Sequence, residues 1–212
     1  MAISVLLVQD HTTTLEGWRV LLEAEDDIEI CCVARDGRTA VDLVRGSPPD
    51  VVVMEAVLPE LNGVEATRQI LAETPRVRLV GLSVHNDRLM DKMMEAGASA
   101  YVGRADSHGS LVEAIRQVQA GNQYVSPQLI GAFGDYIRRS LSGRSSTLTP
   151  REREVLQLTA EGKKAKEIAA ALAVSETTVR SQVWAVRKKL GLDSSAALTK
   201  YAVNEGITSP NP

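Results

Sequence analysis

Polar side chains able to bind a charged group follow several short apolar runs in the first half of the chain. They are Gln9, Asp10, Glu55, Ser83 and Arg104. In open sheets of parallel strands, ligands bind outside the carboxyl ends of the strands, so side chains that follow strands can share one site. The set contains no nucleophile beside a base and no complete metal cluster. We therefore expect a binding or regulatory site here and no enzyme active site, with no bound metal and no cofactor.

The apolar runs before these side chains alternate with amphipathic segments from residue 1 to residue 120. The runs expected to form strands are Ile3–Val8, Ile28–Val33, Val51–Met54, Arg78–Leu82 and Ala100–Val102. The segments expected to form helices are 13–24, 37–45, 64–73, 87–95 and 111–120, the last of them capped by Asp106 or Ser107. Alternating strands and helices favour a parallel sheet covered on both faces. The expected fold of this half is a doubly wound, five-stranded α/β domain.

A helix expected over residues 175–190 has the pattern of a nucleic-acid-binding element. Its apolar face is formed by Val179, Val183, Val186 and Leu190, which recur at helical spacing. Its opposite face carries Thr177, Arg180, Ser181, Trp184, Arg187 and Lys188. Positive charge, short hydroxyl side chains and one aromatic ring on one face suit the major groove of DNA. A solvated surface helix is the alternative interpretation.

The segments before and after this helix favour DNA binding. A short helix over 166–172 and a turn at Ala173–Val174 precede it, which is the order of a helix-turn-helix motif. Further upstream, Thr149 and Glu152 have the spacing of a capping box at the start of another helix. A fourth helix is expected over 194–205. Four helices in about sixty residues can fold as an independent domain.

Charge is distributed unevenly along the chain. Residues 1–120 hold 11 Lys and Arg against 19 Asp and Glu, a net charge of -8, and residues 121–212 hold 13 against 8, a net charge of +5. The two halves add to the net charge of -3 for the whole chain. An acidic half joined to a basic half fits a regulatory module attached to a nucleic-acid-binding module.

The length of 212 residues makes two domains a reasonable expectation. We expect one domain over 1–120, a linker rich in Gly, Pro and Ser over 121–146, and a second domain over 147–212. No secretory leader and no apolar run long enough to span a bilayer is visible, so we expect a cytoplasmic protein without a membrane partner. The adjacent Cys31 and Cys32 lie in an apolar stretch and are expected to be reduced core residues.

Blocks at fixed spacings in the second half carry a resemblance to a known family. They are Leu148–Leu156, Lys166–Ala169, Ser175–Val179 and Arg187–Gly191. With these blocks, residues 147–206 resemble the LuxR-type DNA-binding domain. The resemblance implies a four-helix domain that binds double-stranded DNA as a homodimer. Position by position, it places DNA contacts on or near Lys164, Lys166, Thr177, Thr178, Arg180, Ser181, Trp184, Arg187 and Lys188.

Trp184 departs from the family pattern, in which a basic or polar residue is common at this position. The indole ring could pack on a thymine methyl group or on a sugar of the DNA. It could equally lie at the edge of a contact with another protein. Both alternatives remain open at the level of the sequence.

Two blocks in the first half carry a second resemblance. Residues Pro49–Pro59 with the following Asn62-Gly63, and residues Gly97–Arg104, resemble the receiver domain of bacterial response regulators. The resemblance covers residues 2–120. Together with the LuxR-type match, the whole chain resembles a NarL/FixJ-class response regulator of a two-component system. It implies a flavodoxin-like receiver followed by an all-α, four-helix helix-turn-helix domain.

The receiver-like pocket departs from its family at the positions that perform the chemistry. In the family, an Asp after the third strand accepts a phosphoryl group, two acids after the first strand hold Mg²⁺, and a Lys after the fifth strand contacts the phosphoryl group. The matching residues here are Glu55 for the acceptor, Gln9 and Asp10 for the acids, and Arg104 for the Lys, while Ser83 and Tyr101 keep the switch hydroxyl and aromatic. The pocket therefore resembles an atypical receiver.

These departures oppose phosphorylation. Mg²⁺ is usually anchored on carboxylates, and Gln9 offers only a neutral amide. The extra methylene of Glu55 moves its carboxylate roughly 1 Å outward relative to Asp, and phosphoryl transfer depends on position and charge neutralisation. Arg104 is a planar fork suited to a carboxylate. We hypothesise a pseudo-receiver in which Glu55 reaches toward Arg104 and Ser83 and stands in for part of the phosphorylated state. A relic pocket without regulatory effect and a pocket that is still phosphorylated are the alternatives.

The leading functional hypothesis is a phosphorylation-independent transcription regulator. As a homodimer, it would read half-sites of an inverted repeat about one helical turn apart. One alternative is an interaction module whose degenerate receiver pairs with another regulator as a heteromeric partner. Another is a sensor that binds a small ligand in the pocket, although no residue specifies such a ligand.

Overall fold

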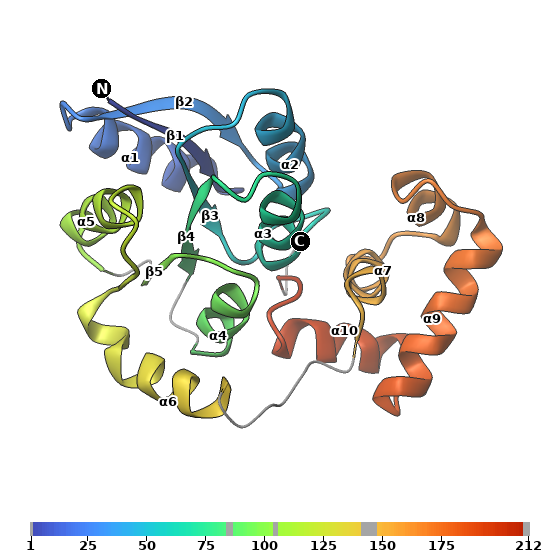
Figure 1. The fold of residues 1–212 in the computed structure, drawn as a ribbon. Coiled ribbons are helices and arrows are strands. Elements are labelled where there is room, and N and C mark those ends of the chain that lie inside the picture. The colour runs from blue at the N-terminus through green and yellow to red at the C-terminus, as the bar shows by residue number, and fades with distance from the viewer. Residues whose placement is uncertain (1, 84–86, 104–105, 141–147, 210–212) are drawn as a thin grey trace. The chain divides into compact units, whose positions relative to one another are not determined.

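The computed structural model describes residues 2–83, 87–103, 106–140 and 148–209, and the side chains of Ser83, Asp87, Arg139 and Ser140 are outside this description. The chain divides into two compact units, Met1–Gly143 and Arg144–Pro212. Each unit is described by itself (Figure 1). Within the described residues, no helix combines the length and the apolarity needed to cross a membrane.

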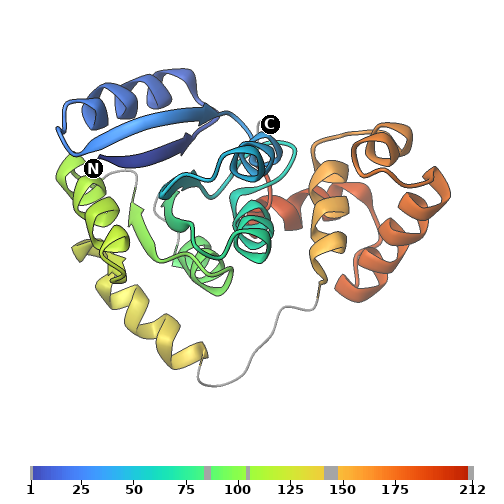
Figure 2. The ribbon, with the colours of Figure 1, turned by 45° about the horizontal axis from the view of Figure 1, so that its top comes forward.

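The first unit is a parallel sheet with helices on both faces (Figures 1 and 2). Its strands are β1 (Ile3–Val8), β2 (Ile28–Ala34), β3 (Val51–Glu55), β4 (Arg78–Ser83), β5 (Ala100–Gly103) and β6 (Tyr124–Val125). Its helices are α1 (Thr12–Glu23), α2 (Gly37–Gly46), α3 (Gly63–Glu73), α4 (Asp87–Glu95), α5 (His108–Gln119), the short 3-10 helix η1 (Pro127–Leu129) and α6 (Ile130–Ser140). The strand order is β2-β1-β3-β4-β5-β6, and every neighbouring pair is parallel. The doubly wound α/β fold is confirmed.

Alternation along each buried strand creates two apolar layers, because successive side chains point to opposite faces of a sheet. In β1, Leu6 and Val8 belong to one core cluster, and Val5 and Leu7 belong to the other. The first cluster also takes in side chains of α2, α3 and α4, and the second takes in side chains of α1 and α5. Helices therefore bury both faces, which is why the strands read as continuous apolar runs.

Local signals set the starts of the helices in this unit. Asp36 accepts a hydrogen bond from the backbone N–H of Thr39 at 2.7 Å to cap α2. Ser107 holds the N-cap position of α5 but makes no side-chain capping bond. The carboxylate of Asp106, the other expected cap, instead accepts from the backbone N–H of Gly103 at 2.7 Å. Asp106 therefore stabilises the turn before the helix.

The segment expected to be a linker from residue 121 contributes instead to the first unit. Its strand β6 pairs with β5, so the sheet has six strands where five were expected. Helix α6 packs through Ala132, Phe133 and Tyr136 against the core cluster on the α4 side. The Phe133 and Tyr136 rings stack with their centroids 5.7 Å apart. Apolar side chains thus hold 124–136 on the sheet despite the Gly and Pro content, whereas residues 141–147 lie outside the described residues.

The adjacent cysteines do not both lie in the core. Cys31 is exposed and Cys32 is partly buried, which corrects the expectation for Cys31. Strand β2 lies at the edge of the sheet, and the pairing of β1 with β2 shifts register between Val5 and Leu6. Because Val5 pairs with Ile30 and Leu6 with Cys32, Cys31 is the extra residue of the bulge.

The second unit is a bundle of four helices. They are α7 (Pro150–Ala160), α8 (Ala165–Ala171), α9 (Glu176–Leu190) and α10 (Ser195–Asn204). The capping box of α7 is confirmed: the Thr149 backbone N–H donates to Glu152 Oε2 at 2.8 Å, and Thr149 Oγ1 accepts from the Glu152 N–H at 3.3 Å. The turn between α8 and α9 places Ala173 at φ 51°, a left-handed conformation that lets the chain reverse within a few residues.

The apolar face of α9 builds the core of the second unit. Val179 and Val186 are buried, and Val183 and Leu190 pack against the two core clusters of this unit. Ser175 caps the helix by accepting from the Thr178 N–H at 3.1 Å. Helix α9 is therefore fixed on one side by its neighbours, and its other side is left at the surface.

Candidate functional site

Sheet register brings Gln9 and Glu55 together at the carboxyl ends of the strands. Strands β1 and β3 are neighbours, and Val8 pairs with Met54. The residues that follow this pair, Gln9 and Glu55, are therefore at the same level of the sheet. Both side chains are buried, with relative exposures of 0% for Gln9 and 1% for Glu55. The two side chains thus meet at one edge of the sheet.

The Gln9 side chain connects the backbone after β1 to the Glu55 carboxylate. Its Nε2 donates to Glu55 Oε2 at 3.2 Å. Its Oε1 accepts from the backbone N–H of His11 at 3.1 Å. The two bonds fix which way the amide faces, because the His11 N–H requires an acceptor and a carboxylate requires a donor.

Asp10 lies beside this pair and is only partly buried. Its Oδ2 is 3.7 Å from Nε2 of His11, in a pair whose His side chain is 67% exposed. Among the described residues, no donor reaches the buried Oδ1 of Asp10. A buried carboxylate oxygen without a donor is unfavourable.

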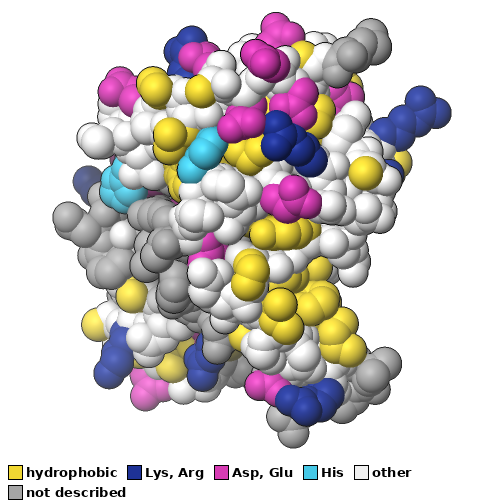
Figure 3. Space-filling model, turned by 90° about the vertical axis from the view of Figure 1, so that its left-hand side faces the viewer, with side chains coloured by type: hydrophobic (Ala, Val, Ile, Leu, Met, Phe, Trp, Pro, Cys, Tyr) yellow, Lys and Arg dark blue, Asp and Glu magenta, His cyan; other side chains and the backbone are white. Residues whose placement is uncertain are grey.

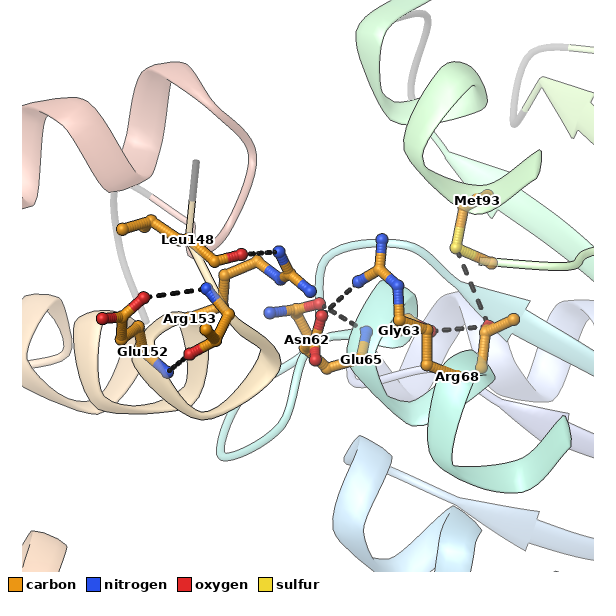
Figure 4. Close-up of polar contacts among 10 residues, drawn as sticks. Asn62, Gly63, Glu65, Arg68, Met93, Leu148, Glu152 and Arg153 are labelled. Carbon is orange, nitrogen blue, oxygen red and sulfur yellow. Dashed lines mark hydrogen bonds and ion pairs between the residues drawn. The ribbon is translucent and has the colours of Figure 1, made fainter. Parts of the chain in front are cut away.

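A tight glycine turn holds the Glu55 end of β3 against α3. The Gly63 N–H donates to the carbonyl of Ala56 at 3.0 Å. A Cβ added at Gly63 would lie 2.1 Å from the Glu55 carbonyl oxygen, so only glycine fits. Asn62 caps α3 by accepting from the Glu65 N–H at 3.0 Å, and the buried Glu65 carboxylate forms an ion pair with Arg68 (Figure 4). Among these residues, the sequence analysis singled out Glu55 and the Asn62-Gly63 pair of the receiver-like block.

Tyr101 is buried in the core below the pocket, with a relative exposure of 1%. Its β4 neighbour is Gly81, and a Cβ there would lie 2.8 Å from Tyr101 Cδ2 and 3.1 Å from Met93 Cε. Glycine at position 81 thus leaves the room that the inward ring occupies. The Tyr101 carbonyl accepts from the backbone N–H of Ser126 at 3.1 Å. Sequence reasoning did not identify Gly81, because its role depends on which strand lies beside β5.

The remaining pocket positions are described only in part. Ser83 ends β4 and pairs through its backbone with Gly103 of β5, while its side chain is not described. Arg104 lies outside the described residues. The contact hypothesised from Glu55 to Arg104 and Ser83 therefore remains a prediction.

A second polar cluster lies between α5 and the loop after α1, next to the start of β2. Arg116 donates to Asp27 at 2.6 and 2.8 Å and to Glu25 at 2.8 Å, and His108 Nε2 lies 3.2 Å from Glu25. Figure 3 shows acidic, basic and histidine side chains together on the face that includes α1 and α5. The hydrogen bond with His108 and those from Arg116 lower the pKa of Glu25, and the Arg116 hydrogen bond lowers the pKa of Asp27. This cluster ties α5 to the loop after α1 and belongs to the scaffold.

The outer face of α9 is the second candidate site. Its exposed side chains are Thr177, Arg180, Ser181, Trp184 and Lys188. They recur at helical spacing and form one continuous stripe. Arg180 pairs with Glu176 at 3.3 Å, and the Ser181 hydroxyl donates to the Thr178 carbonyl at 2.8 Å. The stripe thus presents a cation, an aromatic ring and a second cation along one face.

Trp184 is the large apolar side chain of this stripe, with a relative exposure of 63%. The Lys188 ammonium lies 5.1 Å from its ring centroid, within the range of a cation–π contact. Arg187 is partly buried and donates to Ser195 Oγ at 2.8 Å. With Gly191, Leu192 and Asp193, these three side chains line an open depression of about 550 Å³. In such an arrangement the flat ring can pack on a base or a sugar of DNA, and the neighbouring cation can pair with a phosphate.

Other predicted contact residues fall at different depths in the second unit. Thr178 is half-buried at the start of α9, where its hydroxyl lies 2.9 Å from Ser175 Oγ. Lys164 and Lys166 are exposed at the start of α8. Their positions on the preceding helix of the motif agree with contacts to the DNA backbone, which stays a prediction.

Comparisons with known proteins agree with both halves of the chain. Residues 5–116 match the model of the response regulator receiver domain, and residues 146–202 match the model of the bacterial regulatory proteins of the luxR family. The transcriptional regulatory protein MctR of Rhizobium johnstonii is 34% identical over 208 residues, which is 98% of this chain and 96% of MctR. The response regulator UvrY of Escherichia coli K12 is 32% identical over 208 residues, covering 97% and 95%. A crystal structure of a LuxR-family two-component response regulator from Aurantimonas has 32% identity and a TM-score of 0.60, covering 68% of this chain and all of that one.

Proposed function

We propose that this chain, which belongs to the bacterial response regulators that join a receiver domain to a luxR-family DNA-binding domain, works without phosphorylation. In this proposal it is a cytoplasmic transcription regulator that binds double-stranded DNA as a homodimer. The two copies of α9 read half-sites of an inverted repeat about one helical turn apart. The observation that carries the proposal is the buried, hydrogen-bonded Glu55 at the phosphoacceptor position.

Three features of the pocket support independence from phosphorylation. The residue is Glu, so its carboxylate extends roughly 1 Å beyond that of Asp. Its Oε2 already accepts from Gln9. Its relative exposure of 1% leaves little access for a phosphoryl donor. A carboxyl side chain at position 55 is then present in every molecule and stands in for part of the phosphorylated state.

The stripe on α9 supports the DNA-binding role. Arg180 and Lys188 supply positive charge for phosphates, and Trp184 between them supplies a flat apolar surface for a base or sugar. The surface pair of Arg180 with Glu176 is solvent-exposed and therefore contributes little that would oppose DNA binding. Arg180 is free to exchange Glu176 for a phosphate at small cost.

The DNA-binding part is tested with the full chain and a binding site selected from a random DNA library. Fluorescence anisotropy of the labelled site is measured over a range of salt concentrations. We expect Arg180→Ala to weaken binding and to reduce the slope of log K against log salt by about 1. Lys200→Ala, an exposed cation on α10, is the matched control and should leave the slope unchanged. Equal slopes for the two variants would contradict the assignment of α9.

The phosphorylation part is tested by sedimentation velocity of the wild-type chain with and without Mg²⁺ plus beryllofluoride, a phosphoryl mimic. We expect a dimer in both conditions. A monomer that dimerises on treatment would refute independence from phosphorylation. In addition, Glu55→Ala should weaken the dimer or its DNA affinity. If Glu55→Ala changes neither, the carboxylate is a relic without regulatory effect.

An interaction module is the second candidate function, favoured by the 63% exposure of Trp184. In that case the ring is an anchor for another regulator, and DNA affinity does not depend on it. Trp184→Ala separates the two functions, because it weakens DNA binding only if the ring faces DNA. A variant with unchanged DNA affinity would favour the protein contact.

A further inference from the structure

The pocket at the ends of β1 and β3 has one carboxylate fewer than the cation site that the resemblance to receivers implies, because Gln9 replaces an acid while Asp10 and Glu55 remain. Mg²⁺ requires oxygen ligands in near-octahedral geometry, usually with one or two carboxylates. Here the Gln9 oxygen is already used by the backbone N–H of His11, at 3.1 Å. The group that Gln9 turns toward Glu55 is its N–H₂, at 3.2 Å. The nitrogen of an amide does not ligate a cation, because its lone pair is delocalised into the carbonyl and its N–H groups act only as donors.

We propose that the Gln9 amide takes the place of the cation. It supplies the positive end of a dipole to the Glu55 carboxylate, holds that carboxylate in the pocket, and removes Mg²⁺ binding from this receiver. Gln9 is thus a positioning residue that acts through Glu55. The proposal deepens the proposed function, because it says how a carboxyl side chain can be held at the phosphoacceptor position without a metal.

Burial makes this hydrogen bond important. Glu55 has a relative exposure of 1% and Gln9 of 0%, so neither side chain is compensated by bulk water. A buried carboxylate is stable only when donors or opposite charges surround it. In a pocket that held a third acid in place of Gln9, a cation would have to balance the negative charges. With the amide, that requirement is reduced.

The geometry also explains why the amide does not simply rotate to offer its oxygen. Rotation by half a turn would place the N–H₂ against the His11 N–H and the carbonyl against the Glu55 carboxylate. Both hydrogen bonds would be replaced by like-polarity contacts. Cation binding by wild-type Gln9 would therefore cost both hydrogen bonds, one of them buried and the other partly buried.

The test replaces the amide with a carboxylate of the same shape. The full-length Gln9→Glu chain and the wild type are compared by differential scanning calorimetry at 0 and 10 mM Mg²⁺. We expect the wild-type transition to stay unchanged within 1 °C, roughly the error of such a comparison, because no bound ligand shifts it. For Gln9→Glu, a dissociation constant near 1 mM would raise the receiver transition by about 3–5 °C. Gln9→Leu should lose stability and gain no response to Mg²⁺.

The control for added charge is Gln123→Glu, an exposed residue before β6. It should behave like the wild type. The proposal is overturned if the wild type responds to Mg²⁺ as strongly as Gln9→Glu, or if Gln9→Glu folds and shows no response. If Gln9→Glu folds under neither condition, calorimetric titration of the wild type with Mg²⁺ decides. A dissociation constant for Mg²⁺ below 10 mM, roughly ten times the dissociation constant assumed above, then contradicts the proposal. The absence of binding supports it.

These outcomes are separate from those of the proposed function. A wild-type chain that does not bind Mg²⁺ and does not bind DNA as an untreated dimer would refute the proposed function but not the role of Gln9. A chain that binds DNA as an untreated dimer but takes up Mg²⁺ would do the reverse.

Discussion

Substituting Gly81 by Ala should force the Tyr101 ring out of its position. The new Cβ would lie 2.8 Å from Tyr101 Cδ2 and 3.1 Å from Met93 Cε, whereas carbon atoms pack best at about 3.5–4.0 Å. The Met93 methyl group can move aside, but the Tyr101 ring is rigid and 1% exposed. Overpacking of this kind costs about 1–3 kcal/mol. Replacing glycine also restricts the unfolded chain and contributes about 0.4–1 kcal/mol in the opposite direction.

The clash is the larger effect, so we expect a net destabilisation of about 1–2 kcal/mol for Gly81→Ala. The assay is urea denaturation followed by the fluorescence of Trp18, which is buried in the first unit. Gly17→Ala on α1 is the matched control, since a Cβ there meets nothing within 4 Å. In an exposed helix interior this change should stabilise by about 0.5–1 kcal/mol. The same substitution thus has opposite signs at the two glycines.

A double-mutant cycle identifies the ring as the cause. In a Tyr101→Val background the ring is absent, and Gly81→Ala should then be neutral or slightly stabilising. The coupling energy between the two positions should be about 1–2 kcal/mol. If Gly81→Ala is as stable as the wild type, or if its cost is the same without the ring, the glycine does not make room for Tyr101 and the reasoning fails.

Two further predictions concern the surface of each unit. The pKa values of Glu25 and Asp27 are lowered in the folded state, chiefly by hydrogen bonds with His108 and Arg116 and with Arg116 respectively. The stabilisation from these two carboxylates is therefore present above the ordinary carboxyl pKa and is lost as the pH falls below about 4.5. The urea midpoint, measured at pH 7, 4.5 and 3, should decrease more with falling pH for the wild type than for Arg116→Ala. Parallel curves for the two proteins would contradict this link between pH and stability. Trp184→Ala should change the free energy of unfolding by less than about 0.5 kcal/mol, because the ring is exposed. It should lower DNA affinity by about tenfold in anisotropy titrations. A loss of stability without a loss of affinity would mean that the ring serves the fold and not DNA binding.

Much of the fold follows from the local pattern of the sequence. Apolar runs and amphipathic segments alternate clearly, and the capping box of Thr149 and Glu152 marks a helix start that the structure confirms. Polar residues after strands could be assigned to one site because all strands of a doubly wound sheet point the same way. The pairing of Gln9 with Glu55 in particular follows from β1 lying beside β3.

Features that depend on neighbours distant in sequence could not be predicted. The role of Gly81 requires knowing that the Tyr101 ring turns inward beside it. The exposure of Cys31 results from the edge position and bulge of β2, which an apolar stretch does not reveal. Val125 joins β6 to the sheet because the edge of β5 accepts another strand. In each case the deciding partner lies on another strand.

The two edges of the sheet are both unsuited to recruiting a further strand from another molecule. At one edge, the bulge at Cys31 interrupts the regular row of backbone donors and acceptors on β2. At the other edge, β6 is only two residues long and is followed after Ser126 by Pro127. Edge strands that are regular and long template aggregation, and bulges, short strands and proline prevent it. The chain therefore discourages edge-to-edge polymerisation of its receiver, so that self-association is left to surfaces formed by side chains.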